Sequence, residues 1–371
     1  MKLASIFLSL LFLGFLSETG SRFFYESVTP ESGRRAVHYL ISPPDNPRQL
    51  GKITMHPYML YVHTPNFSGS GFQQINSLGY RGKEFDIRPK TETVRILTLG
   101  GSTTYGDKVR NPLHTWSAEL ENLLRLQSEL PVEVINGGLG AALSADLLAQ
   151  YSFRHRYLKS DIVILHVGWN DTTPLVLANY DPEYARYRGW KRLPLAGRAG
   201  ERTILQSYAI RVAYAWWLRI IEFPRGMNLN TFFFAPTDYF NLKPDHALAN
   251  AMANEPLGFR RNLDLLIRNI INDGALPVLF PVPIAPVAIF DRVDYPMHKE
   301  AWDAFELARS KNVRVMREIA AAYQLPFLEL DAGALSVDHF ADHAHLTHEG
   351  HVIKARFLAD KLPELISHRM K

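Results

Sequence analysis

The chain has 371 residues, enough for one large α/β domain with insertions or for two domains. Hydrophobic residues make up 47% and charged residues 21%, a globular balance that argues against a disordered chain. The net charge is only +4 and no dense run of Lys or Arg occurs, so the sequence does not suggest a nucleic-acid partner. Because the chain contains no cysteine, disulfides, thiolate catalysis and Cys-ligated metals are excluded.

The first 21 residues have the pattern of a signal peptide or of an uncleaved anchor. Lys2 precedes an apolar run over residues 3–16, and a polar stretch follows at 17–21. The run is shorter than a membrane span, and no clean Ala-x-Ala cleavage site follows it. We therefore expect an exported protein (periplasmic, extracellular or membrane-anchored facing outside), with membrane association through this segment if it is not cleaved. A buried N-terminal helix is the alternative.

Residues 22–91 are rich in Pro, Gly and aromatic side chains and contain few periodic runs, which predicts an irregular N-terminal extension with short strands. Near its end, Asn76 and the glycines at 79 and 82 have the composition of a tight turn, since Asn can close the turn and Gly permits a positive φ.

From residue 92 onward, short apolar runs alternate with helical patterns. The runs predict buried strands over residues 94–99, 132–135, 161–167, 277–281 and 326–330. The helical patterns cover residues 115–126, 144–151, 259–273, 301–323 and 350–362. Five alternations predict an α/β fold, a five-stranded parallel sheet covered by helices on both faces, within a domain over residues 92–371. Sites in such sheets form at the carboxyl ends of the strands.

Residues 174–256 interrupt the alternation. They contain Trp190, an apolar helical stretch near 208–221 and three consecutive phenylalanines at 232–234. We interpret them as an insertion at the rim of the sheet that forms a cap over the site, with additional core packing as the alternative for the helix.

Ser102 follows the first predicted strand and two glycines, which allow a sharp turn that exposes the hydroxyl at the start of a helix. The segment is not a Gly-x-Ser-x-Gly elbow, because position 104 is Thr, and it lacks the Gly-Lys of a P-loop. A second glycine-rich strand exit, residues 136–140, can bring a backbone N–H close to a ligand. Alone, each segment is more often a structural turn.

Asp342 and His345 lie three residues apart, a spacing that places both side chains on one side of a tight turn. The carboxylate can then hold the imidazole tautomer while the outer nitrogen takes the proton of Ser102. Five histidines crowd this loop, and a metal cluster is the alternative: His339, His343, His345, His348 and His351. However, the His-Glu-x-x-His spacing is absent, because His348 and His351 are one residue too close.

Asn170 follows the third predicted strand, and its amide can point at a developing oxyanion together with the backbone N–H of Ser102. We expect the neighbouring Asp171 to brace the loop. Without the other motifs, the segment 168–171 would be interpreted as an ordinary turn at the end of a strand.

These motifs resemble those of the SGNH (GDSL-type) hydrolase family over residues 94–362. The resemblance rests on Gly-Gly-Ser-Thr-Thr at 100–104, Asn-x-Gly at 136–138, Gly-x-Asn-Asp at 168–171 and Asp-x-x-His-Leu-Thr-x-x-Gly at 342–350. It implies a flavodoxin-like three-layer α/β/α sandwich, with Ser102 as nucleophile, His345 as base, Asp342 as its partner and Asn170 as oxyanion donor. His-Pro-Tyr at 56–58, together with the segment 76–81, also resembles the lead-in of one bacterial branch of the family.

One position departs from the family pattern, which has Asn-x-Gly-x-x-Gly with an oxyanion N–H from the second glycine. That register falls on Ala141 here, with Gly140 one residue earlier. A backbone donor survives a Gly to Ala change if φ is negative, so we expect the N–H of Ala141 or Gly140 to complete the oxyanion hole.

The sequence therefore predicts an exported serine ester hydrolase that acts through an acyl-enzyme on a carbohydrate O-acetyl ester or a lipid ester, without a cofactor or a metal. Acyl transfer to a polysaccharide would use the same residues. A non-catalytic carbohydrate-binding protein on the same fold and a metal-dependent phosphoesterase are the alternatives from other classes.

Overall fold

The computed structural model of the chain describes residues 17–29, 34, 37, 52–56, 58–68, 74–88, 92–127, 131–185, 187, 199–222, 242–294, 299–331 and 333–369. The chain divides into two compact units. The larger unit comprises Pro47–Tyr187 and Asp238–Lys371, and the smaller unit comprises Met1–Asn46 and Arg188–Thr237. The boundaries expected for the N-terminal extension (22–91) and the insertion (174–256) do not coincide with this division.

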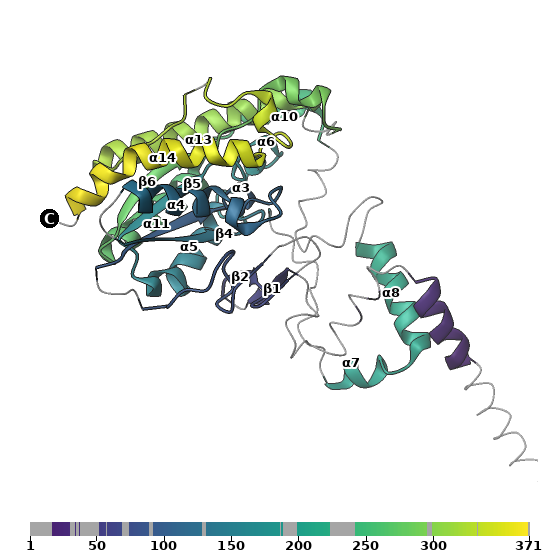
Figure 1. Cartoon of the computed structure of the whole chain (residues 1–371). Helices are drawn as coiled ribbons and strands as arrows, with labels where there is room; N and C mark the ends of the chain where they lie inside the picture. The colour runs from purple at the N-terminus through teal and green to yellow at the C-terminus, as the bar shows by residue number, and fades with distance from the viewer. Residues whose placement is uncertain are drawn as a thin grey trace, which may run out of the picture. The chain divides into compact units, whose positions relative to one another are not determined.

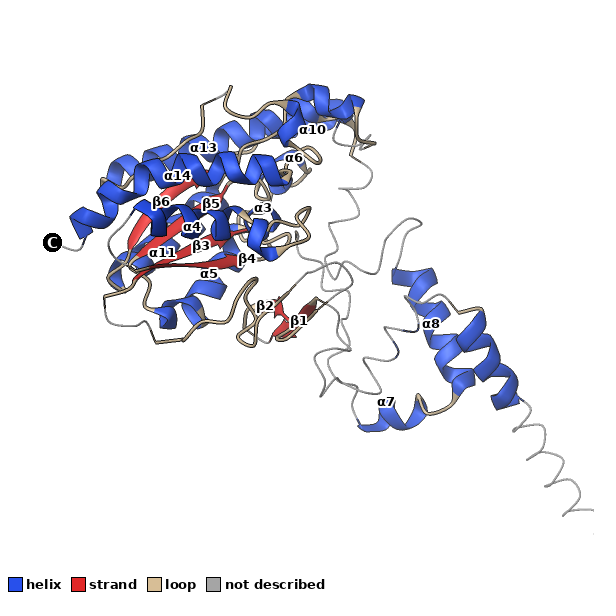
Figure 2. Ribbon diagram, viewed as in Figure 1, coloured by secondary structure: helices blue, strands red, loops and turns tan. Residues whose placement is uncertain are grey.

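The larger unit is built on a four-stranded parallel sheet with the order β4-β3-β5-β6 (Figures 1 and 2). The strands are β3 (Val94–Gly100), β4 (Val132–Gly138), β5 (Ile162–Val167) and β6 (Leu276–Pro281). The predicted fifth strand at 326–330 is corrected: only Phe327 pairs there, in an isolated parallel bridge with Leu279. Backbone hydrogen bonds on both sides of this bridge place the segment next to β6, but regular pairing does not extend along it.

Helices flank both faces of the sheet, which makes three layers. They and the shorter helical turns are α3 (Ser102–Tyr105), η2 (Pro112–His114), α4 (Trp116–Gln127), α5 (Ser144–Phe153), η3 (His155–Leu158), α6 (Thr172–Val176), α10 (Pro244–Ala253), α11 (Leu257–Asn272), η4 (Val287–Asp291), α13 (Trp302–Tyr323), η5 (Val337–His339) and α14 (His348–Arg369). Side chains of α4 and α14 share a buried cluster with alternate strand residues such as Ile164 and Phe280. The intervening residues, such as Leu165 and Leu279, are also buried and point to the opposite face. The helices α11 and α13 contact β6 there, and α5 packs on α11.

The strand order places a topological switch point between β3 and β5. The connection after β3 leads through α4 to β4 on one side, and the connection after β5 leads to β6 on the other. Loops that leave the carboxyl ends of two such strands diverge and open a crevice, which is where ligands bind in sheets of this kind. Ser102 follows β3 and Asn170 follows β5, so the sequence motifs meet at this point.

Two parts of the predicted extension belong to the larger unit. The antiparallel hairpin of β1 (Ile53–His56) and β2 (Leu60–His63) is one of them. The other is the turn near Asn76, whose Oδ1 accepts hydrogen bonds from the N–H groups of Leu78 and Tyr80, at 3.1 and 2.8 Å. This contact confirms that Asn76 closes a local turn.

The smaller unit is helical. It contains a helix over residues 17–27, α7 (Ala199–Ile204) and α8 (Tyr208–Glu222). Its apolar cluster joins both parts of the sequence, because Tyr25 and Val37 are buried with Leu205 and Ala215. Trp190 and the phenylalanines at 232–234 lie outside the described residues, and the cap over the site stays a prediction.

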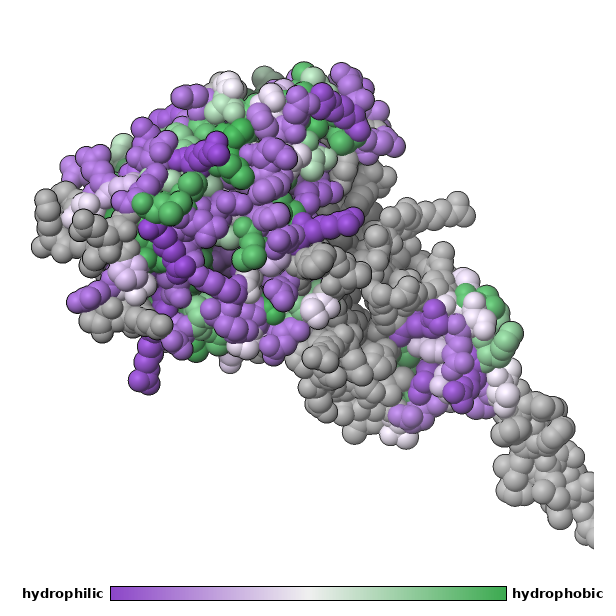
Figure 3. Space-filling view, in the orientation of Figure 1, coloured by the Kyte–Doolittle hydropathy of each residue, from purple (hydrophilic) through white to green (hydrophobic). Residues whose placement is uncertain are grey.

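Polar residues cover most of the visible face of the larger unit, with apolar residues in small scattered groups (Figure 3). Such scatter is normal for a folded protein in water. Among the described residues, no helix combines the length and the apolar character that crossing a bilayer requires.

Candidate active site

The turn that carries Ser102 depends on two glycines. Strand β3 ends at Gly100, and Ser102 is the first residue of the short helix α3. A Cβ on Gly100 would lie 2.3 Å from the His166 carbonyl oxygen, and one on Gly101 would lie 2.5 Å from Asn170 Nδ2. Neither position has room for a side chain, so the glycines let α3 start directly against β5.

Ser102, His345 and Asp342 form one hydrogen-bonded chain. His345 Nε2 lies 2.8 Å from Ser102 Oγ, and His345 Nδ1 lies 2.8 and 2.9 Å from the two carboxylate oxygens of Asp342. The structure therefore brings together the three side chains that the sequence motifs singled out. This geometry lets the imidazole take the Ser102 proton while the carboxylate stabilises the imidazolium that forms.

Asp342 is surrounded by hydrogen-bond donors. Its Oδ1 accepts from the backbone N–H groups of Ala344 and His345, and its Oδ2 lies 3.3 Å from Lys108 Nζ. Burial raises the pKa of the Asp342 carboxyl, but the hydrogen bonds and charge of His345 outweigh burial and hold that pKa well below its usual range. The carboxylate is therefore ionised at neutral pH.

Asn170 lies at the opposite side of the Ser102 turn. Its Nδ2 donates to the Ala142 carbonyl at 2.8 Å. The amide carries two hydrogens, so this contact orients the group and uses one of them. Gly168, with φ of 102°, turns the chain between β5 and Asn170.

The segment 139–142 forms a tight turn in which the Ala142 N–H donates to the Leu139 carbonyl. Ala141 has φ of 57°, so the negative φ that its expected donor role required is absent. This left-handed conformation favours glycine, and it strains a residue that has a Cβ. The predicted contributions of the Gly140 and Ala141 N–H groups stay predictions.

Asp171 is buried and braces the site, in agreement with the expectation for it. Its carboxylate accepts hydrogen bonds from Ser144 Oγ at 2.6 Å, from Tyr184 OH at 2.9 Å and from the Ser144 N–H. Burial raises the pKa of Asp171 to about 6, although these hydrogen bonds act in the opposite direction. The contacts tie the loop after β5 to the start of α5.

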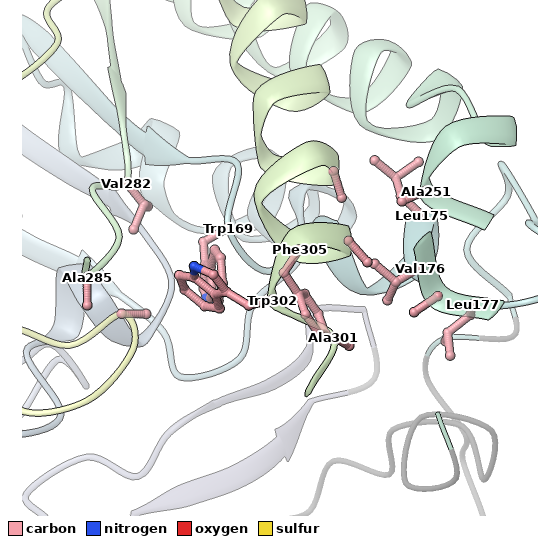
Figure 4. Close-up of a cluster of buried hydrophobic side chains, with 14 of the residues drawn as sticks. Trp169, Leu175, Val176, Leu177, Ala251, Val282, Ala285, Ala301, Trp302 and Phe305 are labelled. Atoms are coloured by element: carbon pink, nitrogen blue, oxygen red, sulfur yellow. The ribbon is translucent and has the colours of Figure 1, made fainter. Parts of the chain in front are cut away.

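An apolar wall lies beside these loops (Figure 4). The ring of Trp169 packs against Trp302, Phe305 and His343, with centroids 5.9, 6.1 and 5.5 Å away. A cavity lined by Gly101, Trp169 and Asn170, among others, has a volume of about 10 Å³, roughly the space of one water molecule.

The other histidines of the 339–351 loop have separate protein contacts. His351 Nδ1 accepts from the Trp116 N–H, His348 Nε2 lies 3.0 Å from Glu119 Oε1, and His339 Nδ1 accepts from the Ser336 N–H. His351 and His348 thus both contact α4, whereas His339 contacts its own loop.

Two residues that support the site were not recognised in the sequence. Arg81 is buried, and its Nη1 donates to the carbonyls of Tyr105 and Gly106 at the end of α3. Tyr61, on β2, donates its OH to the Gly140 carbonyl at 2.8 Å. Only the resemblance of segment 76–81 to a family lead-in pointed toward Arg81, and no pattern in the sequence marked Tyr61.

The fold and the site are those of an SGNH-type hydrolase, with a three-layer α/β/α core. Residues 98–353 match the model of the GDSL-like lipase/acylhydrolase family. The chain belongs to this family and is an ester-bond hydrolase.

The chain is also similar to several solved structures. One is an M. smegmatis aryl esterase, which is 17% identical with a TM-score of 0.43. The match covers 73% of this chain and 99% of the esterase chain. A lipase/acylhydrolase from Enterococcus faecalis is 16% identical with a TM-score of 0.40, covering 72% and 95%. Est24, a carbohydrate acetylesterase from Sinorhizobium meliloti, is 14% identical with a TM-score of 0.41, covering 73% and 99%. No curated protein matches the sequence.

Proposed function

We propose that Ser102 is the nucleophile of an esterase that works through an acyl-enzyme on an ester of a carbohydrate or of a lipid. The observation that carries this proposal is the hydrogen-bonded chain from Ser102 Oγ through His345 to Asp342, with distances of 2.8 Å at both steps. Nucleophilic catalysis by serine requires a base within hydrogen-bond reach and a group that orients the base.

In the proposed reaction, Ser102 Oγ attacks the ester carbonyl carbon and its proton passes to His345 Nε2. The oxyanion receives hydrogen bonds from the Asn170 amide and from the Ser102 N–H. The Ser102 N–H is available because it lies in the first turn of α3, where N–H groups have no intrahelical acceptor. His345 then protonates the leaving alcohol. In the second half, His345 removes a proton from water, which attacks the acyl-enzyme and regenerates Ser102.

Carbohydrate acetyl esters and lipid esters are both candidate substrates, because the chain from Ser102 through His345 to Asp342 serves either. The cavity beside Gly101 and Asn170 is lined by neither Ser102 nor His345, so its volume says nothing about the length of the acyl group. Acetyl transfer to a sugar hydroxyl in place of water uses the same residues and is the second candidate.

Nitrophenyl esters of graded chain length test the proposal on the full chain. We expect loss of hydrolysis in Ser102→Ala, whereas Ser310→Ala, a change on the exposed side of α13, leaves the rate unchanged. A rate optimum at acetyl identifies a carbohydrate acetyl ester as the substrate class, and an optimum at long chains identifies a lipid ester. Activity retained in Ser102→Ala contradicts the serine mechanism. Acetyl release that appears only when an oligosaccharide acceptor is added identifies the transferase.

We also propose that the protein is exported and that the segment before residue 17 stays attached to it at a membrane. Support comes from the contacts of Glu18: its carboxylate accepts from Ser207 Oγ at 2.9 Å and from the Tyr208 N–H at the start of α8. Tyr25, seven residues later, lies in the core of the smaller unit. Cleavage after residue 21 would remove Glu18 from these contacts.

N-terminal sequencing and fractionation of the full chain in an exporting host test this second proposal. We expect residues 2–16 to be retained in the mature protein, and release from membranes by detergent but not by salt. A mature chain that begins after residue 21 and fractionates with free protein contradicts it.

A further inference from the structure

A lysine lies buried behind the Ser102 turn. Lys354, on α14, is 1% exposed, and none of the ion pairs found among the described residues includes it. Its Nζ lies 3.2 Å from His166 Nε2 and 5.3 Å from the centroid of the Trp116 ring. An ammonium group in such surroundings is costly, since a hydrogen bond and a cation–π contact only partly replace its hydration.

His166 connects the lysine to α3. Burial, and after it the charge of Lys354, holds the pKa of His166 well below its usual range, so the imidazole is neutral. Burial also lowers the pKa of Lys354 to about 7, and the side chain can donate to Nε2 both as an ammonium and as a neutral amine. When Nε2 accepts, the ring proton is on Nδ1, which lies 3.0 Å from Thr104 Oγ1 and 3.4 Å from Thr103 Oγ1.

Thr104 is part of α3, two residues after Ser102. A helix of four residues is not stable by itself, so its position depends on side-chain contacts. The Thr104 side chain lies against Gly100, where an added Cβ would come within 2.3 Å of both Thr104 Oγ1 and the His166 carbonyl oxygen. The Lys354–His166–Thr104 chain therefore connects α14, which begins three residues after His345, with the helix that carries Ser102.

We propose that Lys354 is a positioning residue: through His166 and Thr104 it holds the Ser102 hydroxyl in line with His345. Lys354 touches no reacting atom, and its effect is on the placement of the nucleophile. The inference rests on the proposed esterase function. If the wild-type chain does not hydrolyse the ester, the esterase proposal fails; if it does and the Lys354 variant is equally fast, only the inference about Lys354 fails.

The test replaces Lys354 with an apolar side chain of similar length. We expect Lys354→Met to unfold at the same or a higher temperature, because a buried cation is removed, yet to lose about ten- to a hundredfold in kcat with little change in KM. Lys361→Met, on the exposed side of the same helix, is the matched control and keeps full activity. Wild-type kcat in Lys354→Met overturns the proposal.

Two further variants keep the proposal testable if Lys354→Met fails to fold. Thr104→Val removes only the accepting oxygen, and His166→Asn keeps a polar group toward Thr104 but removes the acceptor for Lys354. We expect each to lower kcat, and the double variant of Thr104→Val and His166→Asn to be no slower than the slower single variant, since both interrupt one chain. Losses that multiply in the double variant overturn it.

Discussion

Asn170 stands between two hydrogen-bond partners, the Ala142 carbonyl that it already contacts and the oxyanion that it is proposed to bind. If the amide stabilises the oxyanion, its contribution occurs in the transition state and not in substrate binding. The loss on truncation should then appear in kcat.

We expect Asn170→Ala to lower kcat by about a hundred- to a thousandfold, the cost of removing one oxyanion donor. Steady-state kinetics with an acetyl ester measure it, and Asn122→Ala on the exposed face of α4 serves as control. An Asn170→Ala enzyme with unchanged turnover would remove this residue from the mechanism.

Tyr61 acts on the same site through the backbone, because its hydroxyl holds the Gly140 carbonyl in the turn that contains Ala141. We expect Tyr61→Phe to lower kcat about tenfold, since the strained turn loses a contact that fixes it. Tyr157→Phe, whose ring is 61% exposed, should have no effect. Equal rates for both variants would show that the turn holds its shape without the Tyr61 hydroxyl.

Among the elements, the sequence patterns predicted most of the larger unit. Strands β3 to β6 and the helices α4, α5, α11, α13 and α14 appear near their expected positions, because buried parallel strands and amphipathic helices have strong periodic signals. The segment 326–330 has the composition of a strand, but pairing depends on a neighbour and occurs only at Phe327. Local composition does not contain that information.

The triad was predicted from short motifs, that of Ser102 at the end of a strand and that of Asp342 and His345 in the loop before the last helix. The structure places the three side chains within hydrogen-bond reach. Lys108 and Lys354 could not be predicted. They approach Asp342 and His166 from segments that are distant in sequence and carry no motif. The left-handed Ala141 was missed because the residue type itself argues against that conformation.

Asp171 makes the connection between β5 and α5 sensitive to pH. Its pKa is raised to about 6, so between the usual carboxyl range and pH 6 the folded state binds a proton that the unfolded state has released. The contribution of Asp171 to stability therefore falls as pH rises from about 4 to about 6.

We compare the free energy of unfolding of the wild type with that of Asp171→Asn. The difference between them should decrease by roughly 3 kcal/mol as pH rises from about 4 to about 6, because a shift of about two pKa units corresponds to this free energy. Urea titrations at a series of pH values measure the difference. A difference that is constant with pH, or that grows toward pH 6, contradicts the assignment.

At the scale of the whole molecule, each unit has its own apolar cluster. Among the residues that the structure describes, the cluster of the smaller unit contains only residues of that unit, such as Tyr25 and Leu205. The triad lies entirely within the larger unit. The two units should then unfold separately.

We expect calorimetry to resolve two transitions, and Tyr25→Ala to lower only the transition of the smaller unit, since it removes a buried aromatic ring. Hydrolysis of a small nitrophenyl ester should stay at the wild-type rate. Phe23→Ala, at a side chain that is 70% exposed, is the control. A single transition, or loss of hydrolysis in Tyr25→Ala, would show that the units are coupled.

The smaller unit also imposes an order on biosynthesis, because its two halves are made at different times. Glu18 and Ser207, which contact each other, are separated by 189 residues. At translation rates of about 5–20 residues per second, the first helix waits on the order of ten seconds or more for its partner. During that interval Tyr25 has no core to enter, and β3, β4 and β5 are already synthesised. Completion of the smaller unit must therefore follow emergence of α8 from the ribosome.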